Sequence, residues 1–527
     1  MKHAFIAPMT RDDDATQSLE QKLRQEILFA RERVYHFAKP TPFEQLDLPG
    51  ANFELWVKRE DLSPIKAYKW RGAANRMATL SELEAKRGVV TASAGNHAQG
   101  VALAAKQLGI RARIYMPQST PKVKQDAVIK LGQEYVSVHL AGDSYDEAVK
   151  AARADEASTK STFIHAYDDI QVMAGQGTLA DEIVLSGKGP FDVAYVQIGG
   201  GGMAAGVSTW LKAYWPNIEI VGVEGEGQAS MTASIKAGKP VSLDQVDLFC
   251  DGTAVKQPGN LPFEICQHSI NRFITVSNAQ VTKAIRTLWD GLRSISEPSG
   301  AMGLAAALKE KDSLKGKKVV VILCGANIDF LQIGRIAQSE GSASRFNRTI
   351  RVHIPETPGT MLKLLDSCFS QVDITDFQYG KIDSKIAWPI FSLAAEKLET
   401  IEAVAAKLDE NGYSWQDITG ATDVNFRAIP FRSDLLSHPA FLRLDFYERP
   451  GALHDFLAKQ LTGNENLSYF NYRQSGERIG RALIGLDFPS SFERDAFIMS
   501  LPPQGEGYRL CQSIDAEASA RLSGSTS

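Results

Sequence analysis

Short runs of apolar and β-branched residues alternate with longer helical stretches from about residue 53 to residue 330. Two of these runs, Asp192–Ile198 and Lys317–Leu323, are almost continuously apolar, which is typical of strands covered on both faces. Further runs predict additional strands: 88–92, 114–117, 135–138 and 218–223. The alternation of strands with helices predicts an α/β fold with mostly parallel sheet.

Loops that follow three of these predicted strands suggest a binding site. Four consecutive glycines, Gly199–Gly202, are costly to order, so we expect a ligand to approach this backbone closely. A phosphate is the natural ligand of such a loop. The Ser93–Gly100 loop also places small residues before a helix, where an anion such as a carboxylate binds. Because Ser93, Gly199 and Cys324 each follow a strand, we expect all three at the carboxyl edge of one sheet.

Two alternative interpretations apply to these loops. Gly200, Gly202 and Ala205 also satisfy the relaxed dinucleotide-binding pattern G-x-G-x-x-A. Glu224 ends the next predicted strand, about where a ribose-binding acid belongs. That interpretation leaves the other loops without a role, so we prefer a phosphate loop. His97 could equally be a packed histidine without a chemical function.

The chain beyond residue 338 repeats itself after a small, polar stretch that predicts a linker. Ile354–Met361 matches Phe446–Leu453 around a Pro-Gly pair, at an offset of 92 residues. Phe377–Tyr379 matches Phe470–Tyr472 at an offset of 93 residues, so one residue is inserted between the two matches. Each copy reads strand, Pro-Gly turn, helix, strand, strand, with the last strand at 387–393 or 481–486. This order predicts two ferredoxin-like α+β units in tandem.

The predicted organisation therefore has a catalytic region, a linker and two repeats. Their predicted bounds are 1–337, 338–348, 349–421 and 440–515.

Charge and cysteine content narrow the class of protein. Lys and Arg total 58 against 62 Asp and Glu, and this near balance argues against a surface for nucleic acid or membrane. No run reaches the roughly 18 apolar residues that a membrane span requires. The five cysteines contain no C-x-x-C pair, so we expect neither a disulfide framework nor a cysteine-rich metal site. The N-terminus lacks a signal-peptide core, and a reducing cytoplasm is the expected location.

Five motifs occur in an order that a known family shares. They are Tyr68–Ala73 with its central lysine, the loop Ser93–Gly100, the tetraglycine loop, Glu297–Ala301 and Cys324–Asn327. Together they closely resemble the fold-type II pyridoxal-phosphate enzymes, specifically the serine/threonine dehydratases. The resemblance covers the chain from about Ala30 to Ser513. It implies two open α/β lobes with mostly parallel sheets, followed by two ferredoxin-like, ACT-like α+β regulatory repeats.

The resemblance also implies a role for each matching residue. Lys69 would form the Schiff base with pyridoxal 5′-phosphate, since neither Lys58 nor Lys66 precedes Arg-Gly-Ala at a helix start. Asn96 would hydrogen-bond the 3-hydroxyl of the cofactor, and Cys324 would face its pyridine nitrogen. The residues that would cradle the phosphate are Gly199, Gly200, Gly201, Gly202 and Met203. The residues that would hold the substrate carboxylate are Ser93, Ala94, Gly95, Asn96 and His97.

The implied reaction is elimination of the β-hydroxyl of L-threonine to give 2-oxobutanoate and ammonia, the first step of isoleucine biosynthesis. Lys69 would remove the Cα proton as general base. The repeats resemble the paired ACT-like domains of biosynthetic threonine ammonia-lyases, which implies a homotetramer with isoleucine, or valine, as effector. The same chemistry on serine or another β-hydroxy amino acid is one alternative. A catalytically silent amino-acid sensor is an alternative from a different class.

The sequence departs from related patterns at three places. Serine racemases of this fold carry a serine where Ala94 stands, so racemisation is disfavoured. The acidic residues that hold a divalent metal in those relatives are not reproduced after Glu224, so no metal is expected.

The third departure lies in the repeats, where Gly380 follows Tyr379 but Arg473 follows Tyr472. The regulatory candidates are Tyr379, Tyr472 and Arg473, and we expect the second repeat to matter more. Alternating aromatic residues are also ordinary in any half-buried strand, so a purely structural role stays open for both tyrosines.

Overall fold

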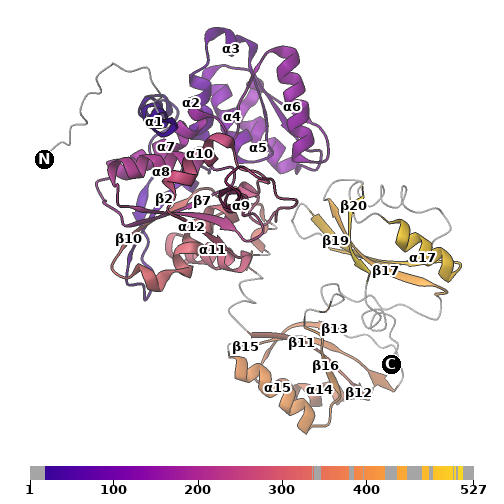
Figure 1. The fold of residues 1–527 in the computed structure, drawn as a ribbon. Helices are drawn as coiled ribbons and strands as arrows, with labels where there is room; N and C mark the ends of the chain where they lie inside the picture. Colours follow the sequence, from indigo (N-terminus) through magenta and orange to yellow (C-terminus); the bar gives the residue numbers. More distant parts are fainter. Residues whose placement is uncertain are drawn as a thin grey trace. The chain divides into compact units, whose positions relative to one another are not determined.

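The computed structural model describes residues 18–330 without a break. Beyond them it describes 332–334, 336–337, 346–355, 357–378, 385–395, 397–419, 421, 436–447, 466–473, 479–501, 504–505 and 508–513. The chain divides into two compact units: the first lies within the residues up to Asn327, and the second includes the residues from Ile328 on (Figure 1). The glycine loops lie in the first unit and the repeated segments in the second.

The larger sheet of the first unit has six strands, all parallel except the edge strand β1. In spatial order they are β1 (Phe43–Gln45), β2 (Glu54–Arg59), β10 (Lys318–Leu323), β7 (Val193–Gln197), β8 (Glu219–Gly225) and β9 (Arg272–Val276). The strands predicted at 192–198, 218–223 and 317–323 are confirmed as β7, β8 and β10. Every residue of β7 is buried, as the continuous apolar run predicts.

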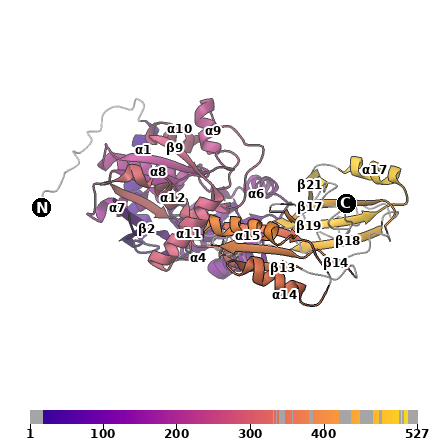
Figure 2. The same cartoon turned by 90° about the horizontal axis from the view of Figure 1, so that it is seen from below.

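Helices cover both faces of this sheet (Figure 1, Figure 2). Those of the first unit are α1 (Leu19–Tyr35), α2 (Trp70–Ala78), α3 (Glu82–Arg87), α4 (Asn96–Leu108), α5 (Lys122–Gly132), α6 (Tyr145–Thr159), α7 (Ile170–Leu185), α8 (Gly202–Tyr214), α9 (Ser230–Ala237), α10 (Asn260–Ser269), α11 (Asn278–Leu292) and α12 (Pro298–Lys309). On one face, Val196 of β7 and Ile322 of β10 join a core with α1, α7, α8 and α10. On the other face α12 packs so closely that a Cβ on Gly303 would lie 3.1 Å from the Tyr195 carbonyl oxygen.

A second, four-stranded parallel sheet carries the Ser93 loop. Its strands, in spatial order, are β5 (Val136–Leu140), β4 (Ala112–Met116), β3 (Val89–Ala92) and β6 (Thr162–Phe163). Ser93 follows β3, whereas Gly199 and Cys324 follow β7 and β10 of the larger sheet. The expectation that all three lie at the edge of one sheet is therefore wrong. A hydrophobic pattern marks where each strand ends, but strand partners are set by packing between distant segments.

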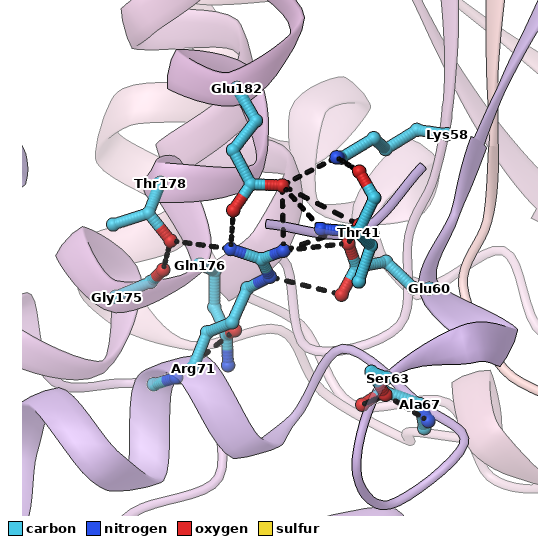
Figure 3. A network of polar contacts seen from close by, with 11 residues as sticks. Thr41, Lys58, Glu60, Ser63, Ala67, Arg71, Gly175, Gln176, Thr178 and Glu182 are labelled. Carbon is cyan, nitrogen blue, oxygen red and sulfur yellow. Dashed lines mark hydrogen bonds and ion pairs between the residues drawn. The ribbon is translucent and has the colours of Figure 1, made fainter. Parts of the chain in front are cut away.

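A buried cluster of charges ties α2 to the larger sheet and to α7 (Figure 3). Arg71 of α2 is fully buried, and its guanidinium donates to both oxygens of Glu60 at 3.0 and 2.9 Å. The same guanidinium donates to both oxygens of Glu182 at 2.6 and 2.9 Å. Lys58 completes the cluster by pairing with Glu182 and by donating to the Thr41 carbonyl oxygen at 2.6 Å.

The cluster holds two cations and two carboxylates, so its charge is balanced. The guanidinium geometry suits this position because its fork donates to two carboxylates at once. Contact with Glu60 and Glu182 raises the pKa of Arg71 further above its usual range, although burial opposes that change. Since Arg71 lies two residues after Lys69, the cluster fixes the start of α2 and with it the position of Lys69.

Each repeat of the second unit has one larger antiparallel sheet, and four strands of these two sheets follow the same order. The first repeat comprises β11 (Phe346–Val352), β12 (Ile354–Pro355), α14 (Thr360–Leu364), β13 (Asp373–Gln378), β14 (Ile386–Ala387), β15 (Ile390–Ala395), α15 (Leu398–Glu410) and β16 (Trp415–Asp417). The second comprises β17 (Pro439–Tyr447), β18 (Asn466–Arg473), β19 (Ile479–Asp487), α17 (Ser491–Ser500), β20 (Gln504–Gly505) and β21 (Tyr508–Ser513). The orders β13-β15-β11-β16 and β18-β19-β17-β21 correspond strand for strand. This correspondence confirms the predicted pair of ferredoxin-like repeats.

Strand register preserves the offsets that the sequence shows. Arg348 pairs with Leu393 in the first repeat, and Ala440 pairs with Leu486 in the second. Arg348 and Ala440 are 92 residues apart, and Leu393 and Leu486 are 93 residues apart, which are the offsets of the matched motifs. Phe377 likewise pairs with Phe391, and Phe470 pairs with Ile484.

Two boundaries in the first repeat differ from the prediction. β11 begins at Phe346, inside the stretch 338–348 predicted as linker. The strand predicted at 387–393 is interrupted at Trp388 and Pro389, because proline cannot donate to a strand ladder. The Pro-Gly turn is present before α14, where Gly359 has a φ of +86°. The matching Pro450–Gly451 lies outside the described residues.

Arg71→Met should lower the free energy of unfolding by about 3–5 kcal/mol, because two buried carboxylates would keep one cation. Urea denaturation followed by tryptophan fluorescence measures this loss. Lys122→Met, which removes the exposed partner of Asp126, is the control and should cost less than about 0.5 kcal/mol. Equal costs for both variants would show that the buried cluster does not hold α2 in place.

Candidate active site

Lys69 is the N-cap residue of α2, and the loop before it is bound to the loop after β10. The Tyr68 N–H donates to the Cys324 carbonyl oxygen at 3.1 Å, and the Ala326 N–H donates to the Lys66 carbonyl oxygen at 2.8 Å. On its other side Lys69 is approached by α4, where a Cβ on Gly100 would lie 3.0 Å from the Lys69 carbonyl oxygen. Glycine at position 100 thus lets the two helices cross at the lysine.

The Lys69 amine is half-buried, and its Nζ donates to the Ala166 carbonyl oxygen at 3.1 Å. Burial lowers the pKa of Lys69 to about 8, an effect that Cys324 and Glu297 partly offset. At neutral pH this shift gives Lys69 a larger share of neutral amine than an ordinary lysine has. A neutral amine is a nucleophile toward carbonyl groups and a base toward C–H protons.

The other two lysines of this stretch have different surroundings. Lys58 is fully buried and engaged with Glu182 and Thr41, and burial lowers its pKa although Glu60 and Glu182 oppose this. Lys66 is exposed and has a left-handed backbone, with a φ of +59°. Of these three lysines, Lys69 alone combines a depressed pKa with a place at the glycine loops.

The Ser93–His97 loop joins β3 to α4. Gly95 is the N-cap residue of α4, and its N–H donates to Ser93 Oγ at 3.2 Å. Ala94 is largely buried, and Asn96 begins the helix. The first backbone N–H groups of a helix have no partner within it, so this end of a 13-residue helix favours an anion.

The His97 side chain is packed, as the alternative interpretation of this residue expected. It is 3% exposed, and its Nε2 lies 3.0 Å from the Ile164 carbonyl oxygen. Burial lowers the pKa of His97 to about 3, and the charge of Lys69 adds to the shift. The ring is therefore neutral at physiological pH, and any contribution of His97 to anion binding comes from its backbone N–H.

The tetraglycine loop leads from β7 into α8, with Gly201 as the N-cap residue. Gly201 has a φ of +91°, a conformation that strains any residue with a side chain. A Cβ on Gly200 would lie 2.3 Å from the Tyr167 ring, and a Cβ on Gly199 would lie 2.9 Å from Thr253 Cα. Met203 follows in the first turn of α8 and is buried. The loop thus brings bare backbone N–H groups to a helix N-terminus, which is the donor set that a phosphate requires.

Glu224 is not available to a dinucleotide. It is fully buried, and its carboxylate accepts from the Met231 and Thr232 N–H groups at 2.8 Å each and from Thr232 Oγ1 at 2.5 Å. Both oxygens therefore bind the start of α9, where a carboxylate stabilises the helix N-terminus. Glu224 therefore cannot bind a ribose, which argues against the dinucleotide-binding interpretation of the glycine loop.

Cys324 lies at the carboxyl end of β10 with its side chain buried. Its Sγ donates to the Ser299 carbonyl oxygen at 3.7 Å. Burial raises the pKa of the Cys324 thiol well above its usual range, and Glu297 adds to the rise. The group is therefore a neutral thiol and supplies no full negative charge to a ligand.

Glu297 and Asn327 also lie at this site, although the sequence analysis gave neither of them a role. Glu297 is 3% exposed and accepts from Asn96 Nδ2 at 2.8 Å and from the Asn327 N–H at 3.1 Å. Burial raises the pKa of Glu297 to about 7, with a further rise from Asp251 and opposition from the two hydrogen bonds. Both residues stand in motifs that the sequence analysis singled out, but only contacts across the fold show what they bind.

Of the three regulatory candidates, the structure describes only the backbone of Tyr472 and Arg473. Tyr379 lies outside the described residues. Tyr472 and Arg473 lie in β18, where they pair with Ala482 and Arg481 of β19, and their side chains lie outside the described part. Their effector role stays a prediction.

Within the described residues, no group of three or more His, Cys, Asp and Glu side chains is placed to hold a metal ion. None of the described helices is long and apolar enough to span a bilayer.

Comparison with known proteins places the chain in a family. Residues 34–325 match the family of pyridoxal-phosphate dependent enzymes. Residues 435–516 match the C-terminal regulatory domain of threonine dehydratase. The L-threonine dehydratase biosynthetic IlvA of Burkholderia multivorans is 36% identical over 482 residues, which are 89% of this chain and 94% of that protein.

Two solved structures are similar to the first unit. Threonine deaminase isoform 2 from Solanum lycopersicum, in its processed form, is 38% identical with a TM-score of 0.59, covering 61% of this chain and 88% of that one. Maize serine racemase is 30% identical with a TM-score of 0.55, covering 60% of this chain and 97% of that one. The predicted family, fold class and cofactor are thereby confirmed. The chain belongs to the pyridoxal-phosphate dependent enzymes and ends in a regulatory domain of the threonine dehydratase family.

Proposed function

We propose that this protein is a threonine ammonia-lyase, which eliminates the β-hydroxyl of L-threonine to give 2-oxobutanoate and ammonia. The observation that carries the proposal is the amine of Lys69, whose pKa is lowered to about 8 at the place where both lobes present their loops. The names of the similar proteins support the choice of threonine as substrate.

Two helix N-termini bind the two anionic groups, the cofactor phosphate and the substrate carboxylate. The N-terminus of α8, with Gly199–Met203, holds the cofactor phosphate. The N-terminus of α4, with Ser93–His97, holds the substrate carboxylate and so orients the Cα–H bond. Asn96 contacts the 3-oxygen of the cofactor. Each helix end offers backbone N–H groups that are already in place, which limits reorganisation on binding.

The chemistry then depends on Lys69 and Cys324. When bound, pyridoxal phosphate withdraws electrons from the substrate Cα and so makes its proton acidic. The free amine of Lys69 would accept that proton on its Nζ as general base. Cys324 would present a neutral thiol to the ring nitrogen, which would limit the electron demand of the ring. Loss of the β-hydroxyl is then favoured over transamination or racemisation.

The regulatory proposal concerns the second unit. Isoleucine, with valine as a second candidate, binds the repeats and lowers apparent affinity for threonine. We further propose a homotetramer in the cytoplasm, with a catalytic region at 1–337 and regulatory repeats at 349–421 and 440–515. The match of residues 435–516 to a regulatory domain supports the role of the second repeat.

Lys69→Ala should lower kcat/KM for 2-oxobutanoate formation by at least about a thousandfold, because the base is removed. Borohydride reduction and peptide mass mapping should place the cofactor on Lys69 in the unchanged protein. Lys66→Asn is the matched control, since Asn tolerates the left-handed backbone at this exposed position. A label on Lys58 or Lys66 would contradict the proposal, as would an active Lys69→Ala variant.

Cys324→Asp should reduce the lyase rate and add abortive transamination, because a carboxylate would hold a proton on the ring nitrogen. The progressive loss of activity during turnover, and its recovery on adding fresh cofactor, measure the side reaction. Cys324→Ser keeps a neutral group and should behave like the unchanged protein. The electronic argument fails if Cys324→Asp retains the full lyase rate without added side reaction.

Isoleucine should raise the apparent KM for threonine several-fold or more, since such coupling is typically worth about 1–3 kcal/mol. Tyr472→Ala and Arg473→Ala should relieve this inhibition more than Tyr379→Ala does. A chain that ends near Gln338 should lose the isoleucine response while it keeps lyase chemistry. Equal relief from both repeats would overturn this assignment, and so would inhibition of the shortened chain.

A further inference from the structure

Asn96, Glu297 and Asn327 form a closed ring of hydrogen bonds beside Lys69. Asn96 Nδ2 donates to Glu297 Oε1 at 2.8 Å, and the Asn327 N–H donates to Glu297 Oε2 at 3.1 Å. Asn327 Nδ2 closes the ring by donating to Asn96 Oδ1 at 2.7 Å. Asn96 belongs to the lobe of the four-stranded sheet, whereas Glu297 and Asn327 follow elements of the six-stranded lobe.

The carbonyl oxygen of Ile65 determines which atoms of the two side-chain amides donate and which accept. Asn327 Nδ2 also donates to the Ile65 carbonyl oxygen at 2.8 Å, and a carbonyl oxygen can only accept. Asn327 must therefore present its amide nitrogen on this side. Asn96 must in turn present Oδ1 to Asn327, which directs Asn96 Nδ2 toward Glu297.

Rotation of the Asn96 amide by 180° is excluded while Glu297 keeps its carboxylate. The rotated amide would set two donors against each other at Asn327 and two acceptors against each other at Glu297. Each mismatch would leave buried polar groups without partners, which is costly. Only one of the two Nδ2 hydrogens is used by Glu297, so the other is held as a fixed donor.

We infer that Glu297 is a positioning residue, which holds the Asn96 amide so that an N–H, not the carbonyl oxygen, is offered to the 3-oxygen of the cofactor. This inference rests on the proposed function, in which Asn96 contacts that oxygen. A buried carboxylate bound by amides is energetically expensive, and it needs a reason to be retained. Here the reason is the orientation of one amide at the reacting end of the cofactor.

Glu297→Gln tests the inference, because it keeps the side-chain shape but places an amide opposite one of the two donors. The first readout is the dissociation constant of pyridoxal phosphate, titrated into apoprotein of the full chain. The second is the absorption maximum of the bound cofactor. We expect about tenfold weaker cofactor binding and a shifted maximum, because one of the two groups that hold the Asn96 amide is changed.

A double-mutant cycle with Asn96→Ala separates positioning from a merely structural role. If Glu297 acts through Asn96, Glu297→Gln should change neither readout further in the Asn96→Ala background. Additive effects would overturn the inference and leave the proposed function intact. If Asn96→Ala itself changes neither readout, the contact of Asn96 with the cofactor is wrong and the proposed site fails with it.

Glu224→Gln is the matched control, since Glu224 is also a buried carboxylate with backbone N–H partners but caps α9. It should lower thermal stability without moving the absorption maximum, and an equal spectral shift would overturn the inference. If Glu297→Gln fails to fold, Asn327→Ala provides the second variant, because it removes the donor that orients Asn96. An unshifted maximum in that variant would also overturn the inference.

Discussion

The buried charge cluster around Arg71 is the interaction on which the position of Lys69 depends. It joins the end of β2, the start of α2 and the last turn of α7 through two carboxylates and two cations. All four of these groups are buried, so each must find its partners within the protein. The cluster therefore allows little change in the relative positions of β2, α2 and α7. It places α2 where Lys69 meets the loops of both sheets.

Burial also decides the protonation states at the site. Glu60 and Glu182 keep Arg71 charged although burial opposes its charge. The same loss of water lowers the pKa of Lys69, because fewer opposite charges surround that amine. It raises the pKa of Cys324 and of Glu297, which are acids. One physical cause thus yields a basic amine, a neutral thiol and a carboxylate that needs amide partners. These are the three properties that the proposed elimination and its positioning ring require.

The two repeats of the second unit share their strand order and register, although their sequences match only at short motifs. The shared feature is the pairing of the first strand with the third. Equivalent residues of the two repeats are 92 positions apart in the first strand and 93 positions apart in the third. The Pro-Gly turn and the alternating aromatic positions survive because they fix strand ends and faces. Residues that differ between the repeats, such as Gly380 and Arg473, are therefore the natural places for a difference in effector binding.

The sequence by itself determined the approximate positions of the strands, the glycine loops, the repeat and the family, because each shows in the local pattern of residues. It located Lys69, Gly199–Gly202 and Cys324 at the ends of the right elements. It did not show that two sheets carry these loops, since strand partners depend on packing between distant segments. Nor did it assign Glu297, whose bond to Asn96 joins residues 201 positions apart. Contacts of that kind leave no local pattern, and only the tertiary structure decides them.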